Sequence, residues 1–133
     1  MIVGGHRDPN DVWDDEMRRQ YHISFENEAV LAKNFLRDGF DVVIEDVIRK
    51  GALYDEWKRH FDGTDHRVVL LLPSLDAALE RNLNRSEKTV PQKTLRDLHA
   101  KYQELDHTGW IVIDNSDQTP EDTVATIRQQ LSL

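Results

Sequence analysis

The sequence predicts an α/β fold in which a mainly parallel sheet lies between two layers of helices. Three short runs of β-branched and aliphatic residues, at 40–45, 67–72 and 110–114, are apolar on both faces, as the strands of a covered parallel sheet are. Segments with the apolar spacing of helices separate these runs. Strands that alternate with helices favour right-handed crossovers, so we expect a three-layer α/β/α sandwich that forms a single domain over residues 1–133.

The chain before the first predicted strand is expected to be helical. Apolar side chains recur with helical spacing over residues 13–36, and we expect two helices there with a break near residues 22–25. Gly39 favours the end of the second of these helices, directly before the strand. A further short helix is predicted over residues 52–61, between the first two strands.

Capping residues indicate the helices of the second half of the chain. Ser74 can cap a helix over residues 75–83, and Pro91 fits the first position of a helix that follows it. Thr119 is a suitable N-cap for a last helix, with the acidic Asp122 at its third position. The predicted order is therefore helix, helix, strand, helix, strand, helix, helix, strand, helix.

The composition excludes several classes of site and partner. The chain contains no cysteine, so disulfides, thiolate nucleophiles and cysteine-based zinc sites are excluded. The formal net charge is −8 and no cluster of Lys and Arg offsets it, which argues against nucleic acid or an anionic membrane as partner. The longest apolar run, residues 68–72, is too short to span a bilayer, and the N-terminal segment lacks a signal-peptide core, so we expect a cytoplasmic protein.

Two acidic residues stand at the end of the first predicted strand, where open α/β sheets bind their ligands. Glu45 and Asp46 point to opposite faces, so only one of them can face a given ligand. A carboxylate in this place can bind a water of Mg²⁺ or accept a proton from an attacking hydroxyl group. A solvated turn with a helix-capping acid is the alternative interpretation.

Two arginines follow the second predicted strand. Arg81 and Arg85 are four positions apart, so on a helix they share one face. Two guanidinium groups on one face can bind phosphate oxygens as bidentate donors, and the polar segment 86–90 after them is typical of a lid. A solvated helix end is the alternative, because basic residues are favoured near a helix C-terminus.

Taken together, these features resemble one family, the P-loop small-molecule kinases. The resemblance is strongest to the chloramphenicol phosphotransferase-like and related AAA-type ATP-binding kinase-like proteins. It covers nearly the whole chain from about Asp8 to the end. The residues that carry it are GFDVVIEDV at 39–47, Trp57, RVVLLL at 67–72, the Arg81 and Arg85 pair, and VIDNSDQTPE at 112–121.

The resemblance implies an ATP-dependent phosphotransferase that acts on a small hydroxylated acceptor and uses Mg²⁺. Asp46, with Glu45 beside it, would face the γ-phosphate and the metal ion. Arg81 and Arg85 would neutralise phosphate charge during transfer. The loop after the last strand, with Asn115, Ser116 and Pro120, would lie against adenine, and residues 13–35 would border the acceptor.

The chain departs from the family pattern in one important respect. No Gly-x-x-x-x-Gly-Lys-Ser/Thr motif is present, and this motif supplies the cradle for the phosphates. In relatives it lies upstream, so we expect the first strands of the sheet to be missing and Met1 to match an internal methionine. The 133 residues should then bind ATP poorly or not at all, and the unpaired strand edges favour self-association or another partner segment.

Two other functions stay open on the sequence alone. A degenerate relative could bind a partner or an acceptor as a non-catalytic α/β module. A P-loop protein could also hydrolyse ATP without an acceptor. The identity of the acceptor does not follow from the sequence.

Overall fold

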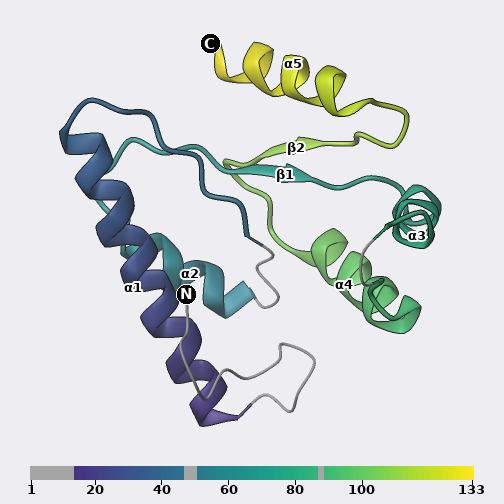
Figure 1. Cartoon of the computed structure of the whole chain (residues 1–133), viewed down its shortest axis with the longest axis horizontal. Helices are drawn as coiled ribbons and strands as arrows, with labels where there is room; N and C mark the ends of the chain where they lie inside the picture. Colours follow the sequence, from purple (N-terminus) through teal and green to yellow (C-terminus); the bar gives the residue numbers. More distant parts are fainter. Residues whose placement is uncertain (1–13, 47–50, 87–88) are drawn as a thin grey trace. The chain divides into compact units, whose positions relative to one another are not determined.

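The computed structural model describes residues 14–46, 51–86 and 89–133, and the chain divides into two compact units, Met1–Thr64 and Asp65–Leu133 (Figure 1). The described part of the first unit contains the helices α1 (Asp15–Arg37) and α2 (Gly51–Arg59). The elements of the second unit, in chain order, are β1 (Val69–Leu71), α3 (Leu75–Leu83), α4 (Gln92–Glu104), β2 (Ile111–Ile113) and α5 (Pro120–Leu131).

The predicted three-layer α/β/α sandwich is wrong. The structure is mostly helical, with 56% helix and 5% strand, and the sheet formed by the described residues has two strands. The single domain expected over residues 1–133 stays a prediction. A sandwich of three layers needs a sheet wide enough to carry helices on both faces, and two strands of three residues each do not provide one.

Helix α1 is one continuous helix of 23 residues, so the predicted break near residues 22–25 is wrong. The segment contains neither Pro nor Gly, and Phe25 continues the buried stripe of the helix instead of interrupting it. The side chain of Asp14 caps the helix by accepting a hydrogen bond of 2.8 Å from Met17 N. Gly39, with φ +85°, follows the last turn, which confirms it as the residue at which the helix stops.

The first predicted strand, residues 40–45, is also wrong, because this segment has no assigned secondary structure and pairs with no described strand. Its alternating side chains nevertheless behave as those of a strand do. Val42 and Ile44 pack against the buried cluster of Ala29, Ala32 and Phe61, whereas Val43 is 93% exposed. The apolar run therefore covers helices of its own unit and takes no place in a sheet.

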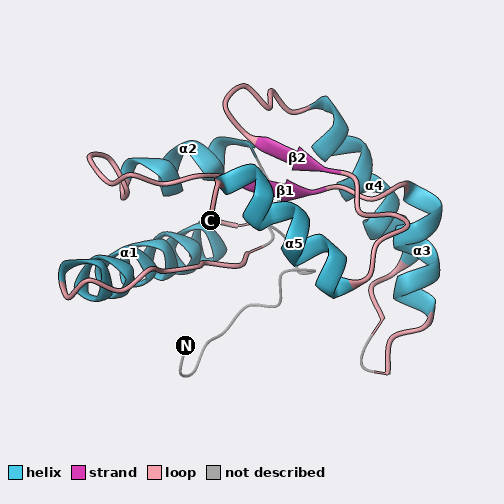
Figure 2. Cartoon of the chain, turned by 90° about the horizontal axis from the view of Figure 1, so that it is seen from above, coloured by secondary structure: helices cyan, strands magenta, loops and turns pink. Residues whose placement is uncertain are grey.

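The other two predicted strands are confirmed, although both are shorter than expected. β1 and β2 run parallel, with Val69 opposite Ile111 and Leu71 opposite Ile113. Beyond the ladder, Leu72 N donates to Ile113 O and Ile111 N donates to Val68 O, each at 2.9 Å. Helices α3 and α4 carry the chain from the end of β1 back to the start of β2, as a parallel pair requires (Figure 2).

The predicted caps of the second unit agree with the structure to within one residue. Ser74 caps α3, with its Oγ accepting from Ala77 N at 3.2 Å. Thr119 and Asp122 form a full capping box at the start of α5. Pro91 is the N-cap of α4, one position before the place predicted for it.

Two surface properties of the chain bear on the expected partners. Among the described residues, no helix is both long and apolar enough to span a lipid bilayer. Within that part of the chain, β1 and β2 each have a strand neighbour on one side. Self-association through the free edges stays a prediction, as does the cytoplasmic location.

Candidate functional site

The candidate site lies where the carboxyl ends of β1 and β2 meet, because parallel strands end at the same edge of a sheet. The two loops that leave this edge are joined by a hydrogen bond of 2.8 Å from Ser74 N to Ser116 Oγ. The Ser116 hydroxyl group in turn donates to Asp114 Oδ1, which also accepts from Ser116 N at 2.9 Å. Ser116 therefore connects the ends of both strands.

Arg81 closes this edge from helix α3. Its Nη2 donates to the carbonyl oxygens of Asn115 at 2.6 Å, of Ser116 at 2.9 Å and of Gln118 at 3.4 Å. The charged donor orients three carbonyl groups of one loop, and such charge-assisted hydrogen bonds are stronger than neutral ones. The structure thus brings Arg81 together with two of the predicted nucleotide-binding residues, Asn115 and Ser116.

The carboxyl group of Asp114 is held in its ionised form. The side-chain and backbone hydrogen bonds from Ser116 lower the pKa of this carboxyl group, and the positive charge of Arg81 lowers it further. Because the ionised carboxylate accepts both hydrogen bonds, it stabilises the turn that begins directly after β2. Asp114 thus orders the loop that Arg81 contacts.

Two amide oxygens of this loop are buried without a hydrogen-bond partner in the described part of the chain, Asn115 Oδ1 and Gln118 Oε1. Gln118 Nε2 donates to Thr126 Oγ1 at 3.3 Å, which fixes the orientation of its amide group. A buried acceptor that lacks a donor is costly, by about 1–3 kcal/mol. Both oxygens are acceptors, but because they are buried a ligand's amino group can reach them only after the loop moves.

His99 is a residue of this edge that the sequence did not indicate. A ring nitrogen of His99, on α4, lies 2.8 Å from the carbonyl oxygen of Pro73, in the loop after β1. The side chain of His99 is half-buried. The available signal was its spacing, because His99 follows Leu98 and precedes Tyr102 on the apolar side of the helix.

The remaining predicted residues of the second unit lie outside this set of hydrogen bonds. Helix α3 ends at Leu83 with Asn84 as its C-cap, so Arg85 lies beyond the helix and the shared helical face expected for the two arginines is not formed. Arg85 is exposed. Pro120 is exposed as well and occupies the first position of α5, where the missing N–H of proline costs nothing.

Glu45 and Asp46 belong to the other unit, at the end of the extended segment, and both are exposed. Their convergence with Arg81 and Arg85 on one polyphosphate stays a prediction. In the described ranges, no three acidic or histidine side chains are grouped so that they could hold a metal ion. The assignment of Mg²⁺ to Asp46 therefore also stays a prediction.

Glu28, on α1, is an acidic residue near Asp46 that the sequence analysis missed. Burial raises the pKa of its carboxyl group first, and the negative charge of Asp46 raises it further, while a hydrogen bond from Trp57 acts in the opposite direction. Two carboxyl groups that repel each other often mark a functional site, although ion-pair networks of structural origin do the same. An ionisable residue between the buried positions Phe25 and Ala32 was the available signal.

Comparisons with known proteins found no relationship for this chain. No protein-family model, no curated protein and no solved structure matches it. The resemblance to P-loop small-molecule kinases accordingly stays a prediction that rests on the residues quoted above.

Proposed function

We propose that the edge formed by β1 and β2 binds the adenine end of ATP in a phosphotransferase that acts on a small hydroxylated acceptor. One observation carries the proposal. The guanidinium group of Arg81 is bonded to three carbonyl oxygens of the loop after β2, beside two buried amide oxygens that lack a donor in the described part of the chain. The carboxyl edge of a parallel sheet is the place where α/β proteins bind such ligands.

Adenine has the chemistry that this edge needs. Its exocyclic amino group has two N–H donors, and Asn115 Oδ1 and Gln118 Oε1 are acceptors without a donor among the described residues. The planar guanidinium group of Arg81 can stack on the face of a flat aromatic ring while Nη2 keeps its bonds to the loop. An adenine base therefore offers donors for these oxygens and a flat face for Arg81.

The proposed reaction transfers the γ-phosphoryl group of ATP. The acceptor hydroxyl oxygen forms a bond to the γ-phosphorus, and the bond from that phosphorus to the β–γ bridging oxygen breaks, so that ADP leaves. The hydroxyl proton passes to a carboxylate, and Mg²⁺, when bound, would supply positive charge to balance that of the phosphates. The Walker A motif that the reaction needs is not present among these 133 residues.

The test is a titration of the isotope-labelled 133-residue chain with adenosine, followed by NMR. We expect saturable shifts confined to the loop 114–119 and its neighbours, weak binding because a nucleoside makes no phosphate contacts, and much smaller shifts with uridine. The Arg81→Ala variant should lose the response. The matched control is Arg128→Ala, which removes an exposed arginine from the last turn of α5.

Several outcomes contradict the proposal. Equal shifts with adenosine and uridine, or an unchanged response of Arg81→Ala, rule out adenine recognition at this edge. Micromolar affinity for ATP would contradict the expectation that the isolated chain lacks an essential phosphate site. Once a Walker A segment is supplied, ADP formation without an acceptor would indicate a hydrolase, and adenosine binding without any ADP formation would indicate a non-catalytic module.

A further inference from the structure

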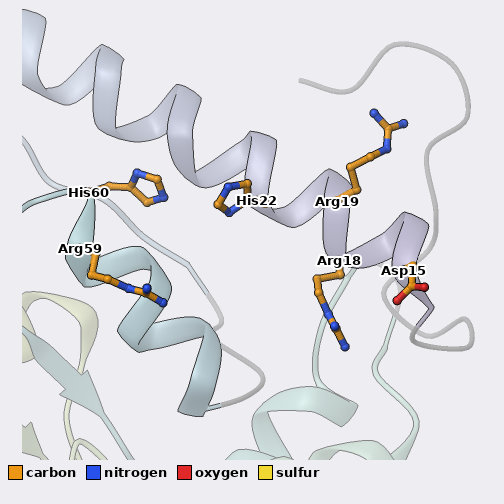
Figure 3. A pocket seen from close by; sticks show the side chains of 6 residues that line it. All are labelled: Asp15, Arg18, Arg19, His22, Arg59 and His60. Carbon is orange, nitrogen blue, oxygen red and sulfur yellow. The ribbon is translucent and has the colours of Figure 1, made fainter.

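A cavity of about 520 Å³ opens between α1 and the end of α2, within the first unit. Its volume lies in the range of small-molecule sites, roughly 300–1,000 Å³. The described residues that line it are almost all basic or aromatic nitrogen donors: Asp15, Arg18, Arg19, His22, Arg59 and His60 (Figure 3). Three arginines and two histidines against one aspartate form a positive lining on a chain whose formal net charge is −8.

The arginines of the cavity differ in how their charge is compensated. Arg19 is paired with Glu16 through two hydrogen bonds of 2.9 Å, so its charge is largely neutralised. Arg59 donates from Nε to a backbone carbonyl oxygen, that of Asp55, at 3.1 Å. Within the described residues, no carboxylate forms an ion pair with Arg18 or Arg59. Two guanidinium charges from two different helices therefore remain available at one cavity.

Arg18 carries a positive charge near the N-terminus of its helix. It lies in the second turn of α1, close to the N-terminus of the helix, where the helix dipole favours negative side chains and disfavours positive ones. Arg59, in the last turn of α2, is placed as the dipole favours. The acidic residues Asp15 and Glu16 offset the positive end of α1, so the positive charge of the cavity comes from its guanidinium groups.

The two histidines add hydrogen-bond donors to the same space. Figure 3 shows His22, from α1, and His60, directly after α2, side by side between the two helices, and their ring centroids are 5.8 Å apart. His22 Nε2 also lies 3.6 Å from Glu26 Oε1. The cavity thus presents imidazole and guanidinium donors from both helices.

We infer that this cavity binds a small ligand through a phosphate group. A carboxylate has two oxygens and one negative charge, so a single guanidinium group suffices for it. A phosphate monoester has three terminal oxygens and about two negative charges, and the lining of the cavity offers it two guanidinium groups and imidazole donors from separate helices. The remaining volume accommodates the organic part of a small phosphate ester. The inference does not depend on the proposed function.

The experiment titrates the labelled chain with ribose 5-phosphate, with inorganic phosphate and with ribose, and follows the spectrum by NMR. We expect saturable shifts of α1 and α2 with ribose 5-phosphate, weaker binding of inorganic phosphate, and no binding of ribose. The Arg18→Ala and Arg59→Ala variants should each bind ribose 5-phosphate about tenfold more weakly, since each substitution removes a charged hydrogen-bond donor. Arg18→Lys keeps the charge and should recover part of the affinity.

The matched control is Arg37→Ala, at the opposite end of the same helix, roughly 28 Å from Arg18 along the helix axis. Far-UV circular dichroism establishes that each variant keeps its helices, which is expected because these arginines are exposed. Absence of saturable binding for both phosphate probes would overturn the inference. An equal loss of affinity in Arg37→Ala would do so too, because it would indicate general attraction by surface charge.

A phosphate group could also come from a nucleotide, and AMP distinguishes that source. If AMP binds while ribose 5-phosphate does not, and Arg81→Ala removes the AMP response, the phosphate belongs to the proposed nucleotide site and the inference is wrong. If ribose 5-phosphate binds equally well to the wild-type chain and to Arg81→Ala, the inference is supported. The latter result holds whether or not adenosine binds, so the two proposals can fail independently.

Discussion

Different kinds of interaction stabilise each of the two units of this chain internally. The buried residues described in Met1–Thr64 are mainly apolar, whereas in Asp65–Leu133 one apolar residue, Ile113, and two polar residues, Asn82 and Thr123, are buried. The second unit has in exchange hydrogen bonds between segments far apart in the sequence, such as those from Arg81 to the loop after β2. A small unit that cannot bury much apolar surface depends more strongly on specific polar contacts.

This difference also separates the two proposed sites. The edge of β1 and β2 is ordered by hydrogen bonds before any ligand binds, so it can select a ligand by the direction of its donors and acceptors. The cavity between α1 and α2 instead presents charges that lack acidic partners among the described residues. Its binding should therefore weaken as salt is added, because exposed charges are screened over about 10 Å at 0.1 M ionic strength, while adenosine binding should change little.

The largest expected effect on stability concerns Met1–Thr64, the unit whose buried residues are mainly apolar. Phe25 is 1% exposed, and Phe25→Ala should lower the free energy of unfolding of Met1–Thr64 by about 3–5 kcal/mol, through lost burial and the cavity left behind. Urea unfolding followed by NMR signals of α1 gives the value. Phe40→Ala is the control, since Phe40 is 61% exposed and should cost far less. An equal loss of unfolding free energy in the two variants would show that the buried apolar residues do not stabilise this unit.

The next largest effect on stability concerns Asp65–Leu133, the unit with buried polar side chains. Asn82 is 4% exposed, donates to Val90 O and accepts from Val90 N, both at 2.9 Å. Asn82→Ala should cost about 2–3 kcal/mol, because two hydrogen bonds are lost and the Val90 groups are left without partners. Urea unfolding followed by signals of α3 and α4 measures it. The exposed C-cap residue Asn84 provides the control, and an Asn84→Ala variant as unstable as Asn82→Ala would contradict the argument.

A smaller effect concerns the loop after β2. Arg81 is exposed, so Arg81→Ala should lower the free energy of unfolding by only about 1 kcal/mol, but the loop should lose its order. Hydrogen exchange of the amide groups of 115–118 should become faster. Arg81→Lys keeps the charge but lacks the planar group. This variant should therefore recover stability more fully than it recovers adenosine binding. Unchanged exchange in Arg81→Ala would show that Ser116 and Asp114 order the loop alone.

The smallest effect concerns Glu28 and is seen in the pH dependence of stability. Because the pKa of Glu28 is raised in the folded protein, the folded state holds this proton more tightly than the unfolded state, and stability should fall as the pH rises above the ordinary glutamate value of 4.5. Glu28→Gln should flatten this fall and stabilise the protein at neutral pH. Thermal unfolding between pH 4 and 8 measures the difference, with the exposed Glu104→Gln as control. A fall of the same slope in Glu28→Gln would exclude Glu28 as its source.

Features that depend on neighbouring residues along the chain could be predicted, and features that depend on distant ones often could not. The caps at Ser74 and Thr119 and the stop at Gly39 follow from bonds within a few residues, and all three are found. The run at 40–45 is rich in apolar and β-branched residues, as is the run at 67–72, yet it forms no strand with the described residues. A strand needs a partner strand, and composition does not specify which segment that is.

The candidate site shows the same division. Arg81, Asn115 and Ser116 were singled out from the sequence through a resemblance, and the structure places them in contact. The half-buried His99 and Glu28 were missed, because a polar residue on the apolar side of a helix gains its role only from what packs against it. Arg85 was expected to share a helical face with Arg81, and the end of α3 at Leu83 prevents it.

The sequence by itself determined where the chain is helical, the caps at Ser74 and Thr119 and the two parallel strands, because the hydrogen bonds of a helix or turn and the apolar pattern of a strand lie within short segments. Only the tertiary structure decided that the chain forms two units and that the sheet of the described residues has two strands. It also decided which polar groups meet, as Arg81 meets the loop after β2. Such contacts depend on burial and on pairing between segments far apart, and no local pattern specifies either.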